Sequence, residues 1–153
     1  MTRNDAPLVR PLVGSDRAAW APLWGAYLAF YETTLPPAAY DTLWSRLMGD
    51  DPHDFHGLIA EVHGRPVGLA HYLFHRHAWK ADNVCYLQDL YADPAVRGTG
   101  VGRALIEGVY AAADAAGCPS VYWMTQEHNS VARVLYDRVG TRTPFIRYAR
   151  RVA

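Results

Sequence analysis

The stretch that decides the fold is YLQDLYADPAVRGTGVGRALI, residues 86–106. Its first residues are rich in β-formers and predict a strand, and its last residues begin the apolar stripe of a helix. Between the two, Gly98, Gly100 and Gly102 stand at every second position, so their backbone N–H groups have no Cβ atoms around them. Because the helix begins at once, these amides and the positive end of the helix dipole converge. The stretch therefore predicts a phosphate or pyrophosphate site, to which Arg97 can add a forked contact.

Other phosphate-binding glycine loops do not fit these residues. The dinucleotide pattern G-x-G-x-x-G needs a third glycine where Arg103 stands, and the NTPase loop needs a Gly-Lys-Ser/Thr that does not follow. What remains is R-x-x-G-x-G, formed by Arg97, Gly100 and Gly102. A glycine-rich turn from strand to helix that binds no ligand is the simpler alternative.

The R-x-x-G-x-G segment closely resembles the acetyl-CoA pyrophosphate loop of the GNAT N-acetyltransferase superfamily, whose pattern is Q/R-x-x-G-x-G/A. A second segment, NSVARVLY at residues 129–136, resembles the family's N-x-x-A-x-x-L/F-Y signature. Asn129 and Tyr136 are two helical turns apart and share one face of the predicted helix. In that family the asparagine helps to hold the coenzyme and the tyrosine protonates its sulfur. The resemblance implies these roles here, and a core-packing aromatic is the alternative for Tyr136.

The resemblance also implies how acetyl-CoA, the expected co-substrate, is held. The strand backbone just before the loop is expected to pair with the pantetheine arm as an added strand would, and the loop to hold the diphosphate. The expected cofactor-binding residues are Leu90, Tyr91, Ala92, Arg97, Gly98, Thr99, Gly100, Val101, Gly102, Arg103, Asn129 and Tyr136.

An amine acceptor is an ammonium in water, so the reaction needs a group that takes its proton. Asp89 is a candidate, because a carboxylate in a hydrophobic run is costly to bury without a partner or a chemical role. In a regular strand it shares a face with Leu87 and Tyr91, unless a bulge shifts the phase. Relatives of the polyamine- and histone-acetylating type, which this region resembles closely, typically carry Leu-Glu-Asp here. The glutamate position is Gln88, which cannot act as a base. Asp89, a water relay or a histidine remain, and a hydrogen-bonded structural acid is the alternative for Asp89.

The end of the first predicted helix supplies candidates for the acceptor site. Tyr27, Tyr31 and Glu32 lie there, and in GNAT folds this region forms one wall of that site. Two tyrosines and a carboxylate can receive an amine cation by charge and ring-face attraction. Together with Gln88 they are the expected substrate residues, and an aromatic core stripe with a solvated glutamate is the alternative.

Seven histidines raise the question of a metal site. His71, His75 and His77 fall on one face of a predicted strand. No cysteine or carboxylate stands at ligand spacing, so we expect no metal. A histidine that lines the acceptor cleft remains a candidate for a proton relay near neutral pH, and plain surface histidines are the alternative.

The composition predicts a single domain over residues 1–153, half of whose residues are hydrophobic. Fifteen basic residues balance fifteen acidic ones, which argues against nucleic acid as a partner. The longest uncharged run, residues 18–31, is too short to span a bilayer, and no charged-then-apolar signal opens the chain. Two cysteines form neither a disulfide framework nor a metal-spaced pair. These observations predict a soluble, cytoplasmic protein without a membrane partner.

The patterns along the chain predict the order β-α-α-β-β-β-α-β-α-β, a mixed α+β arrangement. We expect strands at Leu8–Val13, Phe55–Val62 and Val67–Ala78, in the run that ends at Asp93, and at Ser120–Thr125 and Thr141–Tyr148. We expect helices after Ser15 or Asp16, at Ala38–Met48, from the glycine loop to Gly117, and from Asn129 to Val139. This order resembles the GNAT fold, a central mixed and mostly antiparallel sheet flanked by about four helices.

Together these patterns predict an acetyl-CoA-dependent N-acetyltransferase that acts on a primary amine. Direct attack in a ternary complex is expected, because neither motif has a Cys or Ser at its fixed positions to form an acyl-enzyme. A small amine, a polyamine or an amino acid is favoured as the acceptor, and a protein lysine, as in histone acetyltransferases, is the alternative. A non-catalytic acyl-CoA sensor and a structural domain without coenzyme are the alternatives from other classes. Relatives are often dimers, so a homodimer is a candidate assembly.

Overall fold

The computed structural model describes residues 6–152 of the chain. Its strands are β1 (Leu8–Pro11), β2 (His56–Val62), β3 (Arg65–His75), β4 (Val84–Ala92) and β5 (Val121–Tyr122). Its helices are α1 (Arg17–Phe30), α2 (Pro37–Leu47), α3 (Val101–Ala115) and α4 (Ser130–Val139), with two short 3-10 helices, η2 (Gly14–Asp16) and η3 (Pro94–Val96).

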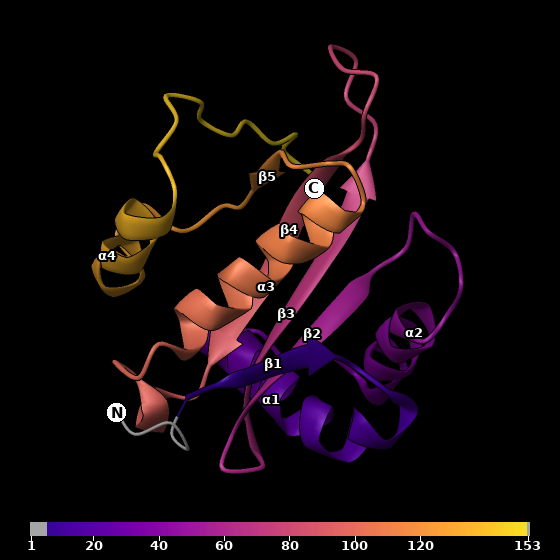
Figure 1. Ribbon diagram of the computed structural model, residues 1–153, viewed down its shortest axis with the longest axis vertical. Coiled ribbons are helices and arrows are strands. Elements are labelled where there is room, and N and C mark those ends of the chain that lie inside the picture. Colours follow the sequence, from indigo (N-terminus) through magenta and orange to yellow (C-terminus); the bar gives the residue numbers. More distant parts are fainter. Residues whose placement is uncertain (1–5, 153) are drawn as a thin grey trace.

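The five strands form one sheet in the order β1-β2-β3-β4-β5, in which the first four are antiparallel and β5 is parallel to β4. Figure 1 shows α3 running along one face of the sheet, while α1 and α2 pack on the other. The predicted α+β fold, with a mostly antiparallel mixed sheet and four helices, is confirmed. Within residues 6–152, no helix is long and apolar enough to cross a bilayer.

Each face of the sheet has its own hydrophobic core, because the helices bury different stripes. α3 buries an aliphatic stripe at helical spacing, formed by Val101, Leu105, Ile106, Val109 and Ala113. On the opposite face α1 and α2 bury Trp20, Trp24 and Trp44. The ring of Trp20 lies 5.5 Å from that of Trp24 and 4.9 Å from that of Trp44. This tryptophan core determines what surrounds the polar residues of β4.

A β-bulge in β4 decides which of its side chains reach the tryptophan core. Asp89 is the partner of His71 in β3, but the next pair in β4 is formed by Leu87, so Gln88 has no partner. Because side chains alternate along a strand, the extra residue reverses the alternation at this point. Leu87 packs in the α3 core, whereas Asp89 contacts Trp24 of α1. Leu87 and Asp89 therefore do not share a face, because this bulge shifts the phase that a regular strand would have kept.

β4 and β5 separate after two residue pairs. Cys85 pairs with Val121 and Tyr86 with Tyr122, while β4 continues to Ala92. Beyond Tyr86, the β5 side of β4 has no strand partner within the described residues, and a cleft opens there.

The segment after α4 does not form the strand predicted for Thr141–Tyr148. In the described chain these residues run without strand structure, and Phe145, Ile146 and Tyr148 are 81%, 76% and 88% exposed. β5 is only two residues long and offers almost no edge for a further strand, and Pro144 lacks an N–H for a ladder. The tail instead runs back past β5 (Figure 1) and lines the cleft.

Candidate active site

The cleft beside β4 brings together residues from three distant segments of the sequence. It holds about 1010 Å³ and is bounded by the end of α1, by β4 and β5, by α4 and by the tail. Of the predicted catalytic and substrate residues, Tyr27, Tyr31, Gln88, Asp89 and Tyr136 all line it. The cleft is therefore the candidate active site.

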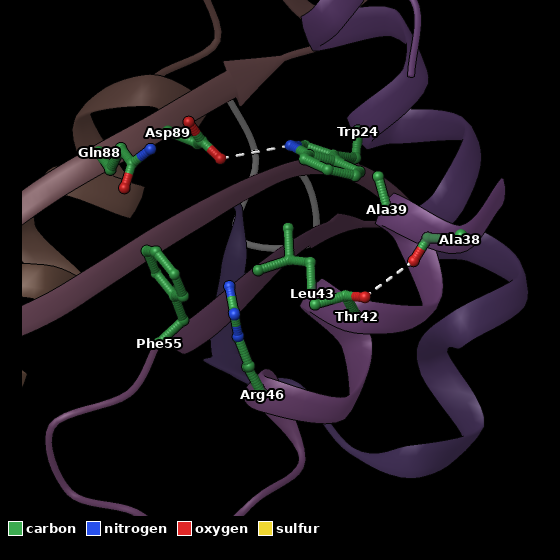
Figure 2. Close-up of a pocket in the computed structure, with 9 residues that line it drawn as sticks. All are labelled: Trp24, Ala38, Ala39, Thr42, Leu43, Arg46, Phe55, Gln88 and Asp89. Atoms are coloured by element: carbon green, nitrogen blue, oxygen red, sulfur yellow. Dashed lines mark hydrogen bonds between the residues drawn. The ribbon is translucent and has the colours of Figure 1, made fainter. Parts of the chain in front are cut away.

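Asp89 is buried, with 8% of its surface exposed, and His71 and Trp24 hold it from the core. His71 Nδ1 lies 2.8 Å from Asp89 Oδ2, and the indole N–H of Trp24 donates to the same oxygen at 3.3 Å, the contact dashed in Figure 2. Trp20 Nε1 donates to His71 Nε2 at 2.9 Å. Because Nε2 accepts a hydrogen bond, Nδ1 carries the proton and donates it to Asp89, and the imidazole is neutral. These hydrogen bonds offset the desolvation cost of burying the Asp89 carboxylate and fix the orientation of its side chain.

Asp89 also faces a second, smaller pocket on the side of α2. This pocket holds about 410 Å³ and is drawn in Figure 2. Its lining is formed by Trp24, Ala38, Ala39, Thr42, Leu43, Arg46, Phe55, Gln88 and Asp89. Since Gln88 and Asp89 line both hollows, the bulge stands at the point where they meet.

Tyr136 lines the cleft from α4. Its ring lies 5.6 Å from that of Trp123 at a steep angle. Burial, and after it the neighbouring Tyr31, raise the pKa of Tyr136 to about 12. A tyrosine with this pKa keeps its proton at neutral pH and can donate it, and the carboxyl group of Asp89 offers oxygen atoms that can accept one. One cleft thus holds a proton donor and a proton acceptor.

Tyr27 and Tyr31 lie together at the end of α1, with ring centroids 5.2 Å apart. Burial, and after it the Asp89 carboxylate, raise the pKa of both hydroxyls, so both stay neutral beside that charge. Glu32 follows them with a φ of +54° but is exposed and lines neither pocket. The structure brings the two tyrosines into the site and leaves Glu32 outside it.

The glycine loop joins β4 to α3. Gly98 and Gly100 have φ values of +82° and +87°, which favour glycine, and nothing lies within 4 Å of the place where a Cβ would stand. The amide of Ala104 bonds back to the carbonyl of Gly100, so the amides before it in the first turn have no acceptor inside the helix. At Gly102 the reason for glycine differs, because a Cβ there would lie 3.1 Å from Leu135 of α4. The loop presents amides to open space, as an anion site requires.

The other predicted coenzyme residues lie outside both pockets. Arg97 is exposed at the loop, and Arg103 pairs with Glu107 at 2.9 Å on the surface of α3. Asn129 precedes α4 without capping it through its side chain, and instead donates to Thr125, which lines the cleft.

Thiol and metal chemistry find little support in the structure. Cys85 is fully buried, and burial, with Cys118 nearby, raises the pKa of its thiol to about 12, so it is neither exposed nor ionised as a nucleophile must be. His71 is bound in the Asp89 network, and His75 Nε2 lies 2.7 Å from the hydroxyl of Tyr122. Within residues 6–152, no three His, Cys, Asp or Glu side chains are grouped to hold a metal ion.

Sequence reasoning missed the partners of Asp89. His71 and Asp89 are 18 residues apart, and Trp20 is 51 residues from His71. One signal was available, because a hairpin formed by the two predicted strands places a histidine opposite a carboxylate. No comparable pattern in the sequence indicates that Trp20, Trp24 or Arg46 lies near Asp89 or its pockets.

The sequence matches known proteins over most of its length. Residues 20–141 match the model of the Acetyltransferase (GNAT) family. The chain is 37% identical over 148 residues to the D-amino-acid N-acetyltransferase HPA3 of Saccharomyces cerevisiae, and the match covers 96% of this chain and 92% of that protein. It is 33% identical over 100 residues to the thialysine N-epsilon-acetyltransferase of Bos taurus, which covers 60% of this chain and 58% of that protein.

Solved structures share the fold. The aminoglycoside N-acetyltransferase AAC(6')-Iy in complex with CoA has a TM-score of 0.83 at 18% identity, with 100% of this chain and 99% of that chain covered. At this identity the likeness concerns the fold alone. Because the family model spans most of the chain and the yeast relative matches nearly all of it, the protein belongs to the GNAT acetyltransferase family and is an N-acetyltransferase.

Proposed function

We propose that this enzyme moves the acetyl group of acetyl-CoA to a primary amine of a small molecule, by direct attack in a ternary complex. The observation that carries the proposal is that Asp89 and Tyr136, a proton acceptor and a proton donor, line one cleft. That cleft opens where β4 and β5 separate, beside a strand edge that is free to bind an extended ligand.

In this proposal acetyl-CoA lies along the open edge of β4. The pantetheine arm pairs with the backbone of residues 90–92 as an added strand does. The diphosphate meets the free amides of the glycine loop, with Arg97 beside it. The open space at Gly98 and Gly100 supports this placement. Solved structures of the same fold that hold CoA support the choice of coenzyme.

The proposed reaction releases the free coenzyme, the amide and one proton. The acceptor ammonium first loses one proton to solvent, and its nitrogen then attacks the thioester carbonyl. As the N–C bond forms, the nitrogen becomes acidic and passes its second proton to Asp89, directly or through a water. The C–S bond then breaks, and the leaving thiolate takes the proton of Tyr136. Solvent returns a proton to Tyr136 while Asp89 releases the one that it received.

Several features support a small acceptor. Asp89 stands between hollows of about 410 and 1010 Å³, so a small molecule in the first can reach the carboxylate that faces the second. Two relatives are named for D-amino acids and thialysine, which are small amines. The balanced formal charge of the chain creates no strong acidic field for a basic protein tail.

Tyr136→Phe tests the proposal. The variant removes the proton donor and keeps the ring against Trp123, so kcat should fall about a hundredfold or more while the Kd for CoA stays within about twofold. Thiol release from acetyl-CoA with a panel of amines measures kcat, and calorimetry measures Kd. Because the pKa of Tyr136 is about 12, the wild-type rate should show no decline from this residue below about pH 11.

Tyr72→Phe is the matched control. Tyr72 is also buried, and burial raises its pKa, but it lines neither pocket, so this variant should keep the wild-type rate. Equal rates for the wild type and Tyr136→Phe would remove Tyr136 from the mechanism. Absence of thiol release with every amine would refute transfer to a small amine.

We also propose a homodimer that covers the tail, in a cytoplasmic setting. Phe145, Ile146, Tyr148 and Val152 are between 76% and 88% exposed, and large apolar side chains gathered in one segment usually mark an interaction surface. A second copy can supply the strand edge that β5 lacks. Both cysteines are free thiols, which supports a reducing compartment.

A further inference from the structure

The smaller pocket has the character of a small-molecule site. Its volume of about 410 Å³ and its mainly apolar walls are typical of such sites, which carry only a few polar groups. Its apolar lining is formed by Trp24, Ala38, Ala39, Leu43 and Phe55. Because Asp89 also lines the larger cleft, a molecule bound here has one end at the place where the proposed reaction occurs.

Among the residues that line this pocket, two are charged, and their signs are opposite. Asp89 lies on β4, and Arg46 belongs to the last turn of α2. Figure 2 shows the Arg46 side chain reaching between Leu43 and Phe55 toward the strand that carries Asp89. The hydroxyl of Thr42 is already committed, because it donates to a carbonyl of its own helix at 2.9 Å. Arg46 is therefore the charged hydrogen-bond donor that the pocket offers to an anion, beside the neutral amide of Gln88.

Arg46 has no carboxylate partner in the described chain, whereas five other arginines have one. Those that form ion pairs with Asp or Glu are Arg10, Arg17, Arg65, Arg103 and Arg142. Arg46 forms no ion pair with any residue between 6 and 152. Its position in the last turn of a helix favours a cation because of the helix dipole. Arg46 is exposed and lines the pocket, so its guanidinium is available to a ligand there.

We infer that the smaller pocket binds an acceptor that carries a carboxylate as well as the amine, and that Arg46 binds this carboxylate. The inference rests on the proposed function and names its substrate class. The guanidinium forks onto the carboxylate, the amine lies at Asp89, and an apolar substituent lies against Leu43 and Phe55. One cation and one anion in one pocket match an amino acid, and the cation repels the second ammonium of a polyamine.

Acceptors that differ in the carboxylate test the inference. Phenylalanine, as each enantiomer, is compared with 2-phenylethylamine by thiol release from acetyl-CoA. The wild type should prefer at least one enantiomer of phenylalanine. Arg46→Gln should lower kcat/KM for it about tenfold to a hundredfold and change the value for 2-phenylethylamine by less than about threefold. Arg46→Lys keeps the charge but cannot form the forked contact, so its kcat/KM for phenylalanine should lie between the values of the wild type and Arg46→Gln.

Arg76→Gln is the matched control, because Arg76 is exposed in the loop after β3 and lines neither pocket. Its kcat/KM should equal that of the wild type with phenylalanine and with 2-phenylethylamine. If Arg46→Gln does not fold, 3-phenylpropionate, which has the carboxylate without the amine, should compete with the acceptor in the wild type and compete more weakly in Arg46→Lys.

Three results would overturn the role of Arg46: no preference of the wild type for phenylalanine, an equal loss with both acceptors in Arg46→Gln, or equal inhibition of the wild type and Arg46→Lys. In each of them thiol release is still observed with some amine. A failure of the proposed function differs, because no amine would then release thiol.

Discussion

Replacing His71 tests both the stability and the chemistry of the buried network. The side chain is fully buried and bonded at both ring nitrogens, to Asp89 at 2.8 Å and to Trp20 at 2.9 Å. In His71→Leu the bond to the charged carboxylate is lost, which costs about 1.5–3 kcal/mol, and the buried indole N–H is left unpaired, which costs about 1–3 kcal/mol. We therefore expect the free energy of unfolding to fall by about 3–5 kcal/mol, a large part of the stability of an ordinary domain.

Urea denaturation measures this loss. With an m-value of about 2 kcal/mol per molar, the unfolding midpoint of His71→Leu should drop by about 2 M. An unchanged midpoint would show that the hydrogen bonds at His71 do not hold Asp89 in the folded protein, and the reasoning from burial would be refuted.

Two conservative variants separate the structural role of His71 from its role in the reaction. In His71→Asn the amide can still donate to Asp89, but the acceptor for Trp20 is lost. In His71→Gln the longer side chain can still accept from Trp20, but the donor to Asp89 is lost. Both should destabilise the protein, whereas kcat/KM should fall further in His71→Gln. Equal activity of the two variants would make His71 a packing residue and would remove its role in positioning Asp89.

Two further predictions concern the glycine loop and the tail. Gly100→Ala should lower stability by about 1–2 kcal/mol, because alanine disfavours a φ of +87°, and should also weaken CoA binding in calorimetry. Gly64→Ala is the control, because Gly64 lies at a hairpin turn with a φ of +75° and equally open space. It should lower the stability by the same amount and leave CoA binding unchanged. Equal CoA affinities of the two variants would argue against the loop as the diphosphate site. In sedimentation experiments the wild type should behave as a dimer and Ile146→Asp as a monomer. A wild-type monomer would refute the proposed assembly.

The sequence predicts features that depend on neighbours along the chain. The helical stripe from Val101 to Ala113 and the glycine stop at Gly117, whose φ is +71°, both follow from local spacing and turn chemistry. The backbone of Gly98 and Gly100 follows from their residue type in the same way. For these elements, the structure repeats what short-range rules require.

Features that depend on distant partners could not be predicted in the same way. The bulge at Gln88 exists because of how β4 pairs with β3, and a single strand carries no sign of an extra residue in its ladder. The network around Asp89 depends on tryptophans of α1 whose helical spacing indicates only a core face. The tail, residues 141–148, has the composition of a strand, but a strand also needs a partner, and within the described chain it has none. Tyr136 was predicted from a motif, whereas its place in the same cleft as Asp89 required the fold.

The unpaired Gln88 has a consequence for insertions and deletions. Removing it would join Leu87 directly to Asp89 and restore an unbroken ladder between β3 and β4. Because adjacent residues of a strand point to opposite faces, Leu87 would stay under α3 and Asp89 would stay opposite His71. The deletion would instead remove a side chain that lines both hollows. The fold can therefore lose this residue without a change of register, just as the connection before β4, residues 76–83, can gain or lose residues at small cost.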